Sequence, residues 1–211
     1  MLKTERTAVM NLENAIRGMR NPLSSWDKSD SAYDAEGNYI LGEADLRLGQ
    51  KLAASGSDHR KFLRQIFVSV DITAPLYWWK EFDTYKVGTV ANSTSTMHKI
   101  HAKSFSRDDF SCDRMSEETV ACLDCVIAML EKKRLAYIET KERQPWHDMI
   151  QLLPSSYNQM RTCTLNYENL INIYYARRNH KLPEWHVLCD WILTLPYARE
   201  FITVREREDS L

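Results

Sequence analysis

The chain has 211 residues, with 28 Lys and Arg against 29 Asp and Glu and a formal net charge of -1. This balance gives no general electrostatic reason to bind nucleic acid or an anionic membrane. Hydrophobic residues make up 44% and charged residues 27%, a globular composition that excludes disorder, and the length suits a single domain over residues 1–211. Ten Tyr and six Trp are the unusual feature, since both side chains suit cores and ligand pockets alike.

The N-terminal sequence and the cysteines bear on the compartment. MLKTERTAVM lacks the apolar stretch of a signal peptide, and no run approaches the roughly 20 apolar residues of a membrane span. Five cysteines are an odd number, which argues against a disulfide framework. The sequence therefore predicts a cytoplasmic protein. The C-x-x-C of Cys122 and Cys125 lies in the apolar run VACLDCVIAML, and we expect both thiols in the core.

The first part of the chain is predicted to contain two amphipathic helices, followed by a short third helix that Asp58 caps and that runs through Phe62 and Ile66. Apolar residues at helical spacing predict the first over 11–19, ended by Asn21-Pro22, and the second over 43–54. Between them, residues 22–42 are rich in Ser and Asp and are predicted to form a long loop, a kind of segment that is usually either disordered or functional.

The rest of the chain is predicted to be mostly helical. FVSVDITAP, at 67–75, is rich in β-branched residues and is the best strand candidate, and Ser116 fits a helix N-cap. The other expected elements are a helix over 76–86, an irregular segment or edge strand over 88–97, helices over 116–142 and 146–153, a strand within 155–165, and helices over 166–178 and 183–202, the last bent at Pro196. The predicted class is α/β (α+β), mainly helical with a small mixed sheet.

Motif searches from the residues alone leave the chemistry open. The chain has no G-x-G-x-x-G, no P-loop and no G-x-S-x-G. His180, Glu184 and His186 do not have a standard metal-ligand spacing, so no metal is predicted. A basic group of arginines and a lysine precedes the last helix, and it suits either an anion site or a solvated surface; its members are Arg161, Arg177, Arg178 and Lys181.

Two segments resemble the flavin-dependent thymidylate synthases, the ThyX family. The first is TAPLYWWKEFDTYKVGT. The family has a strand, then A-P, then a helix that carries R-Q and leads to R-H-R-x-x-S. Aligned at Ala74-Pro75, the family's R-Q falls on Lys80-Glu81, its R-H-R on Thr84-Tyr85-Lys86 and its Ser on Thr89.

The family motif N-E-x-S-x-R follows, and with a one-residue insertion it is echoed by Asn92 and Ser95. The second segment is RNHKLPEWHV. The family has an Arg followed at the same interval by A-Q-W-E-I, and these positions are Arg178 and residues 183–187 here. The two matches occur in the family's order.

The resemblance implies a ThyX-like α/β fold in a homotetramer that binds FAD, dUMP and methylene-tetrahydrofolate. In this family NADPH reduces the flavin, which mediates transfer of a one-carbon unit to dUMP. The resemblance assigns nucleotide or phosphate binding to Lys80, Glu81, Lys86, Thr89, Asn92, Ser95 and Arg178, and it suggests ring stacking for Tyr77, Tyr85 and Trp185. It assigns no catalytic residue.

Several motif positions depart from the family. The two arginines of R-H-R are Thr84 and Lys86, and the Gln of R-Q is Glu81. Lys keeps a charge but lacks the bidentate fork of Arg, and an ionised Glu repels a phosphate unless it is paired. Each lost charge-assisted hydrogen bond is worth about 1.5–3 kcal/mol. The sequence therefore predicts that the fold and a nucleotide-sized cleft persist while FAD binding is weakened.

Two functional hypotheses follow. The first is a divergent flavin-dependent methyltransferase that acts on a pyrimidine nucleotide. The second is a non-catalytic protein that senses or sequesters a nucleotide or cyclic-nucleotide signal. The second is motivated by the exchange of arginines in an aromatic segment, because aromatic side chains suit base stacking.

Overall fold

The computed structural model describes residues 2–204, and these form two compact units that interleave along the chain. One unit combines residues 2–3, 71–84 and 92–162. The other combines residues 4–70, 85–91 and 163–204. None of the helices in the described residues is long and apolar enough to cross a membrane.

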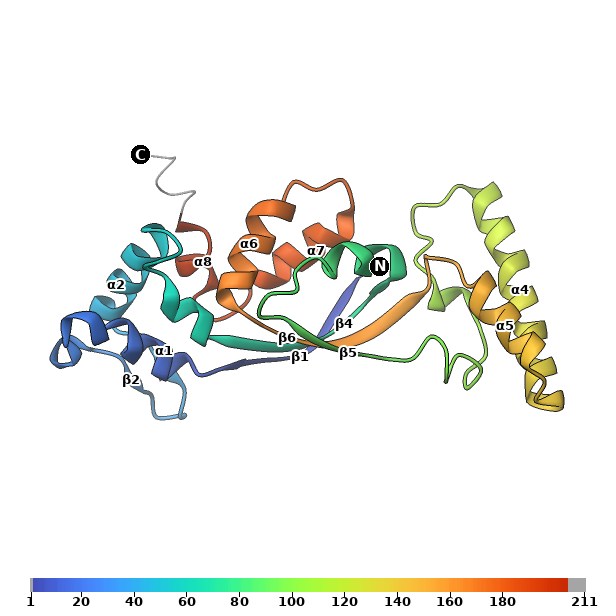
Figure 1. Ribbon diagram of the computed structural model, residues 1–211. Helices are drawn as coiled ribbons and strands as arrows, with labels where there is room; N and C mark the ends of the chain where they lie inside the picture. The colour runs from blue at the N-terminus through green and yellow to red at the C-terminus, as the bar shows by residue number, and fades with distance from the viewer. Residues whose placement is uncertain (1, 205–211) are drawn as a thin grey trace. The chain divides into compact units, whose positions relative to one another are not determined.

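A four-stranded sheet has the order β1-β4-β6-β5 (Figure 1). Its strands are β1 (Lys3–Met10), β4 (Phe67–Pro75), β6 (Asn158–Asn166) and β5 (Val90–Ser93). In β4 a buried residue alternates with a partly exposed one, as expected of a strand with one covered face. The predictions of a strand at 67–75 and of a second strand near 155–165 are confirmed. Strand β1 was not predicted, because nearly all of its residues are exposed and it shows no apolar alternation.

The unit that includes residues 4–70 contains most of the helices. Its elements are α1 (Leu12–Met19), η1 (Asn21–Leu23), η2 (Trp26–Lys28), the hairpin of β2 (Ala32–Tyr33) and β3 (Tyr39–Ile40), α2 (Glu43–Ala54), η3 (Lys61–Gln65), α6 (Tyr167–Arg177), α7 (Pro183–Ile192) and α8 (Ala198–Phe201). Phe62 meets Phe201 edge to face, with 5.5 Å between ring centroids. The buried Tyr167 donates its hydroxyl proton to the carbonyl of Pro196 at 2.6 Å. These contacts tie α6, α8 and η3 into one core.

The predicted loop over 22–42 holds more structure than expected. It contains two short 3-10 helices and an antiparallel hairpin in which Tyr33 pairs with Tyr39, and two carboxylates, those of Asp30 and Asp45, hold it against α2. Asp45, fully buried, accepts hydrogen bonds from Arg20 Nε at 2.5 Å, from the Ser29 hydroxyl at 2.7 Å and from the Ser31 hydroxyl at 2.6 Å. The loop is therefore a defined segment.

The unit that includes residues 92–162 is built on a pair of long helices. Its elements are α3 (Leu76–Phe82), η4 (Arg107–Asp109), α4 (Glu117–Thr140) and α5 (Arg143–Leu152). Ser116 is the N-cap of α4, as predicted, and its hydroxyl accepts from the backbone of Thr119. The core between α4, α5 and the preceding loop contains Ile100, Phe105, Phe110, Leu123, Leu130 and Met149.

Four expectations about helices are corrected. Cys122 and Cys125 are exposed rather than buried, because α4 turns Leu123 and Leu130 inward instead. The last long helix ends at Ile192, where a continued helix would bring the ring of Pro196 against a carbonyl four residues back. The helix expected over 76–86 ends at Phe82, and that expected over 146–153 begins at Arg143.

Candidate functional site

The segment that resembles R-H-R-x-x-S is attached to the junction of α6 and α7. Arg177 donates its Nε–H to the hydroxyl of Tyr85 at 2.8 Å. The same guanidinium lies over the ring of Trp185, 4.6 Å from its centroid, and 5.6 Å from the centroid of Tyr85. The rings of Tyr85 and Trp185 are 6.0 Å apart. The structure thus brings together one residue from each family-like segment, with Arg177 in contact with both.

A second hydrogen bond, two residues after Tyr85, holds the same loop on α6. Asn169 donates its side-chain N–H to the carbonyl of Val87 at 2.7 Å. Gly88 has φ +73°, and a Cβ there would lie 3.1 Å from the amide nitrogen of Asn166 and 3.2 Å from the amide oxygen of Asn169. The close approach and the left-handed backbone both favour glycine. The loop is therefore held in one conformation on the start of α6.

Thr89, which the predicted alignment places on the family's Ser, lies at the end of this loop. Its hydroxyl oxygen is buried and has no hydrogen-bond partner within the described part of the chain. A buried hydroxyl without a partner costs about 1–3 kcal/mol, so such an atom is a candidate for contact with a ligand. Lys86, in the same loop, is exposed.

Arg178 caps the end of α6. Its backbone N–H donates to the carbonyl of Tyr174 at 2.9 Å, and its guanidinium lies 5.1 Å from the ring centroid of Tyr175. It is half-buried and directly follows Arg177. Trp185 is fully buried, and the guanidinium of Arg177 lies over its ring. Stacking of a ligand ring on Trp185 stays a prediction.

The remaining predicted residues belong to the other unit. Lys80 is exposed on α3, while Glu81 and Tyr77 are half-buried on the same helix. The hydroxyl of Thr84 donates to the carbonyl of Glu81 at 2.7 Å, which closes the end of α3. These placements leave the roles predicted for Lys80, Glu81 and Tyr77 as predictions.

Asn92 and Ser95 lie on and just after the edge strand β5. Asn92 is exposed. The hydroxyl of Ser95 accepts from the backbone N–H groups of Met97 at 3.2 Å and His98 at 2.8 Å, so it shapes a turn. Their assignment to a nucleotide also stays a prediction.

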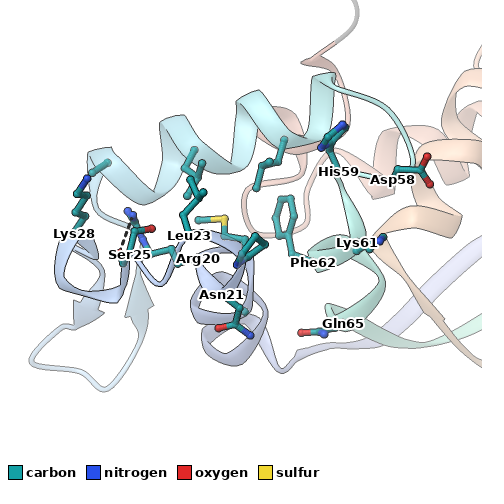
Figure 2. Close-up of a pocket in the computed structure, with 16 residues that line it drawn as sticks. Arg20, Asn21, Leu23, Ser25, Lys28, Asp58, His59, Lys61, Phe62 and Gln65 are labelled. Atoms are coloured by element: carbon teal, nitrogen blue, oxygen red, sulfur yellow. Dashed lines mark hydrogen bonds between the residues drawn. The ribbon is translucent and has the colours of Figure 1, made fainter.

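The sequence did not predict a cavity of about 710 Å³ in the unit that holds α1, α2 and η3 (Figure 2). Its wall includes the apolar side chains of Leu48, Leu52 and Phe62. The polar residues around it include Arg20, Asn21, Lys28, Asp58, His59, Lys61 and Gln65. Cavities of this size, mostly apolar with a few polar groups, are typical of small-molecule sites. The sequence feature that could have indicated this cavity is the Ser- and Asp-rich loop. Four of its residues line the cavity: Pro22, Leu23, Ser25 and Lys28.

The wall of this cavity is held by the buried ion pair of Arg20 and Asp45. Burial by itself would raise the pKa of Asp45, but hydrogen bonds from Ser31, Ser29 and Arg20 outweigh it and hold the pKa below its ordinary value. Asp30 is in a similar state, because its carboxylate accepts the backbone N–H groups of Ala44 and Asp45, which lowers its pKa. Both carboxylates remain ionised at neutral pH and fix the loop against the first turn of α2.

Comparison with solved structures identifies this architecture. ThyX from Helicobacter pylori, in a crystal structure with FAD and dUMP, superposes with a TM-score of 0.73 over 96% of this chain and 97% of that one, at 16% identity. The fold is that of the flavin-dependent thymidylate synthases. The UMP/dUMP methylase PolB from Streptomyces cacaoi, bound with 5-Br dUMP, superposes with a TM-score of 0.65 over 96% of this chain and 94% of that one, at 11% identity. No family model and no curated protein sequence matches the chain.

The positions that resemble the flavin motif do not supply its donors. At the positions that the predicted alignment gives to the two arginines of R-H-R, this chain has Thr84, whose hydroxyl donates to a backbone carbonyl, and the exposed Lys86. Tyr85, in the place of the His, is bonded to Arg177. A flavin diphosphate would meet one ammonium at these three positions instead of two bidentate guanidinium groups. These three side chains therefore fit a flavin diphosphate poorly.

Proposed function

We propose that this protein binds a pyrimidine nucleotide in a thymidylate synthase-like fold. The observation that carries the proposal is that both solved structures described above span nearly the whole chain and were crystallised with dUMP or its 5-bromo analogue. The Helicobacter pylori structure holds FAD as well. The nucleotide is thus the ligand that the two have in common.

Within the unit that holds both family-like contacts, the binding residues are Lys86, Thr89 and Arg178. Arg178 offers a planar set of donors that matches a phosphate, and it is the one anion-binding position unchanged from the family pattern. The buried hydroxyl of Thr89 needs a hydrogen-bond partner, which a nucleotide would provide. Tyr85, which is partly exposed in the same loop as Lys86 and Thr89, is the ring that would stack on the base.

The reaction class depends on whether a flavin binds. Methylation of dUMP in the manner of the family would require a bound flavin. In that case the chain's own residues hold the nucleotide and position its ring.

The second candidate is a nucleotide-binding protein without turnover. The observation that favours it is the contact of Arg177 with both Tyr85 and Trp185, which occupies the aromatic pair with the protein's own cation. A protein of this kind would sense or sequester a nucleotide or a cyclic nucleotide.

One preparation distinguishes the two candidates. The full-length protein is purified without added ligand, its visible spectrum is recorded, and the ligand released on denaturation is identified by mass spectrometry. A flavin spectrum together with a pyrimidine nucleotide supports the methyltransferase, and a pyrimidine nucleotide alone supports the binding protein. If no pyrimidine nucleotide is released and a panel of them gives no thermal shift, the proposal is wrong.

A further inference from the structure

Helix α4 exposes two cysteines that take no part in its packing. One side of the helix lies against α5 (Figure 1), and its buried residues are Leu123 and Leu130. Cys122 and Cys125 lie outside this core, and both are exposed, free thiols. Cysteine is among the residues most often buried in proteins, so two exposed cysteines three positions apart are unusual.

Met129 adds a third sulfur on the same side of the helix. It is 42% exposed and lies four residues after Cys125. Residues three and four positions apart are neighbours on a helix surface, with their Cβ atoms about 5–6 Å from each other. Cys122, Cys125 and Met129 therefore form a line of three exposed sulfur-bearing side chains, which we call the sulfur row.

The spacing of the sulfur row suits a single ion held between the two thiolates. A metal–sulfur bond is about 2.3 Å long, so two sulfurs on opposite sides of one ion are about 4.6 Å apart. Rotation about the Cα–Cβ bonds lets cysteines at this helical spacing reach that separation. Met129 has a longer, unbranched and flexible side chain, so its thioether reaches the same ion from the next turn.

The chemistry of these donors selects a soft ion. Thiolates and thioethers favour Cu⁺, whereas carboxylates and water favour Mg²⁺ and Ca²⁺. The carboxylate of Asp124 is paired with Arg107. That of Glu131 is paired with Arg134. A structural Zn²⁺ site takes four ligands, and within residues 2–204 no three His, Cys, Asp or Glu side chains are grouped so that they could hold a metal ion.

We propose that Cys122, Cys125 and Met129 bind Cu⁺, or a similar soft monovalent ion such as Ag⁺, on the exposed side of α4. The ligands are the thiolates, so one bound Cu⁺ replaces two thiol protons, and the copper is neither oxidised nor reduced. This proposal does not depend on the proposed function, because it concerns residues that the nucleotide site does not use.

The test measures the affinity of the full-length protein for Cu⁺ by competition with the coloured chelator bathocuproine disulfonate. Ascorbate in an anaerobic buffer keeps the copper monovalent. Wild-type protein is expected to take one Cu⁺ per chain from the chelator. Cys122→Ser and Cys125→Ser each leave a single thiolate and are expected to weaken binding about 100-fold or more. Met129→Leu keeps the volume without the sulfur and is expected to weaken it about 3- to 10-fold.

Two double variants separate the spacing of the thiols from their number. Cys122→Ser with Ala128→Cys has thiols at positions 125 and 128, three residues apart, and is expected to regain most of the affinity. Cys125→Ser with Ala128→Cys has thiols at positions 122 and 128, six residues apart and on different sides of the helix, and is expected to stay weak. Ala128 is exposed, so both variants carry the same substitution at a surface site.

Cys112→Ser is the control for the remaining thiols, because Cys112 lies outside the sulfur row and its loss should leave the affinity for Cu⁺ unaltered. The proposal is overturned if wild-type protein binds Cu⁺ no more tightly than Cys122→Ser, or if the two double variants bind it equally. It is equally overturned if Met129→Leu keeps the wild-type affinity or if an equal concentration of Zn²⁺ displaces the copper.

Discussion

Asp45 is the residue on which the N-terminal loop depends. Its buried carboxylate accepts hydrogen bonds from Arg20, Ser29 and Ser31 at once, and so it joins three points of the segment that walls the cavity. A buried ion pair of this kind is weak evidence for net stability, but removing one partner leaves an uncompensated charge. The effect of a substitution should therefore be large.

Asp45→Asn is expected to lower the free energy of unfolding by about 3–5 kcal/mol, since Arg20 would remain buried without its carboxylate. Urea denaturation measures this value. Glu36→Gln, at an exposed site in the same loop, is the control and should cost no more than about 0.5 kcal/mol. Equal losses in the two variants would contradict the role given to Asp45.

The same carboxylate makes a pH prediction. The folded-state pKa of Asp45 lies below its ordinary value of 3.8, so its stabilisation is present above that value and is lost as pH falls through the folded-state pKa. We expect the melting temperature of the wild-type protein to fall more steeply below about pH 4 than that of Asp45→Asn. Parallel pH profiles for the two proteins would count against the prediction.

Arg178 makes the residue-scale prediction for ligand binding. Arg178→Ala removes a charge-assisted bond worth about 1.5–3 kcal/mol, so the Kd for dUMP should rise roughly 10- to 100-fold. Lys181→Ala, three residues along and exposed, is the matched control and should change the Kd less than about twofold. Isothermal titration calorimetry measures both. An unchanged Kd in Arg178→Ala would remove this residue from the site.

At the scale of elements, sequence patterns predicted those helices and strands that bury one face and expose the other. β4 alternates buried and partly exposed residues, and the apolar spacing of α2 is regular, so both were predicted. The run VACLDCVIAML is apolar on all sides, and its period could not show that Cys122 and Cys125 point outward. β1 is an exposed edge strand. Its extended conformation depends on pairing with β4, and its own sequence shows no strand pattern.

The loop from Tyr85 to Thr89 gives the element-scale prediction. Gly88→Ala and Gly37→Ala both place a side chain at positive φ, which costs about 1–2 kcal/mol. Only at position 88 does the new Cβ also press on Asn166 and Asn169. Gly88→Ala should therefore unfold at lower denaturant and bind dUMP more weakly, while Gly37→Ala keeps wild-type affinity in calorimetry. Wild-type affinity in Gly88→Ala would show that this loop does not contribute to binding.

At the scale of the whole molecule, the resemblance read from two short segments predicted the fold, and comparison over 96% of the chain bears it out. The site was less accessible to sequence reasoning. The contact of Arg177 with Tyr85 joins residues 92 positions apart, and the cavity is assembled from helices whose packing no local pattern reveals. The many Trp and Tyr residues serve both purposes that the composition left open. Trp78, Trp79 and Trp185 are core residues, and Tyr85 is partly exposed at the candidate site.

The most direct test of pyrimidine-nucleotide binding is calorimetric titration of the full-length protein with dUMP, with deoxyuridine and dAMP as comparisons. We predict saturable binding of dUMP to each chain, much weaker binding of deoxyuridine because it lacks the phosphate, and weaker binding of dAMP because its ring is a purine. Absence of dUMP binding, or equal binding of dUMP and dAMP, would contradict the account.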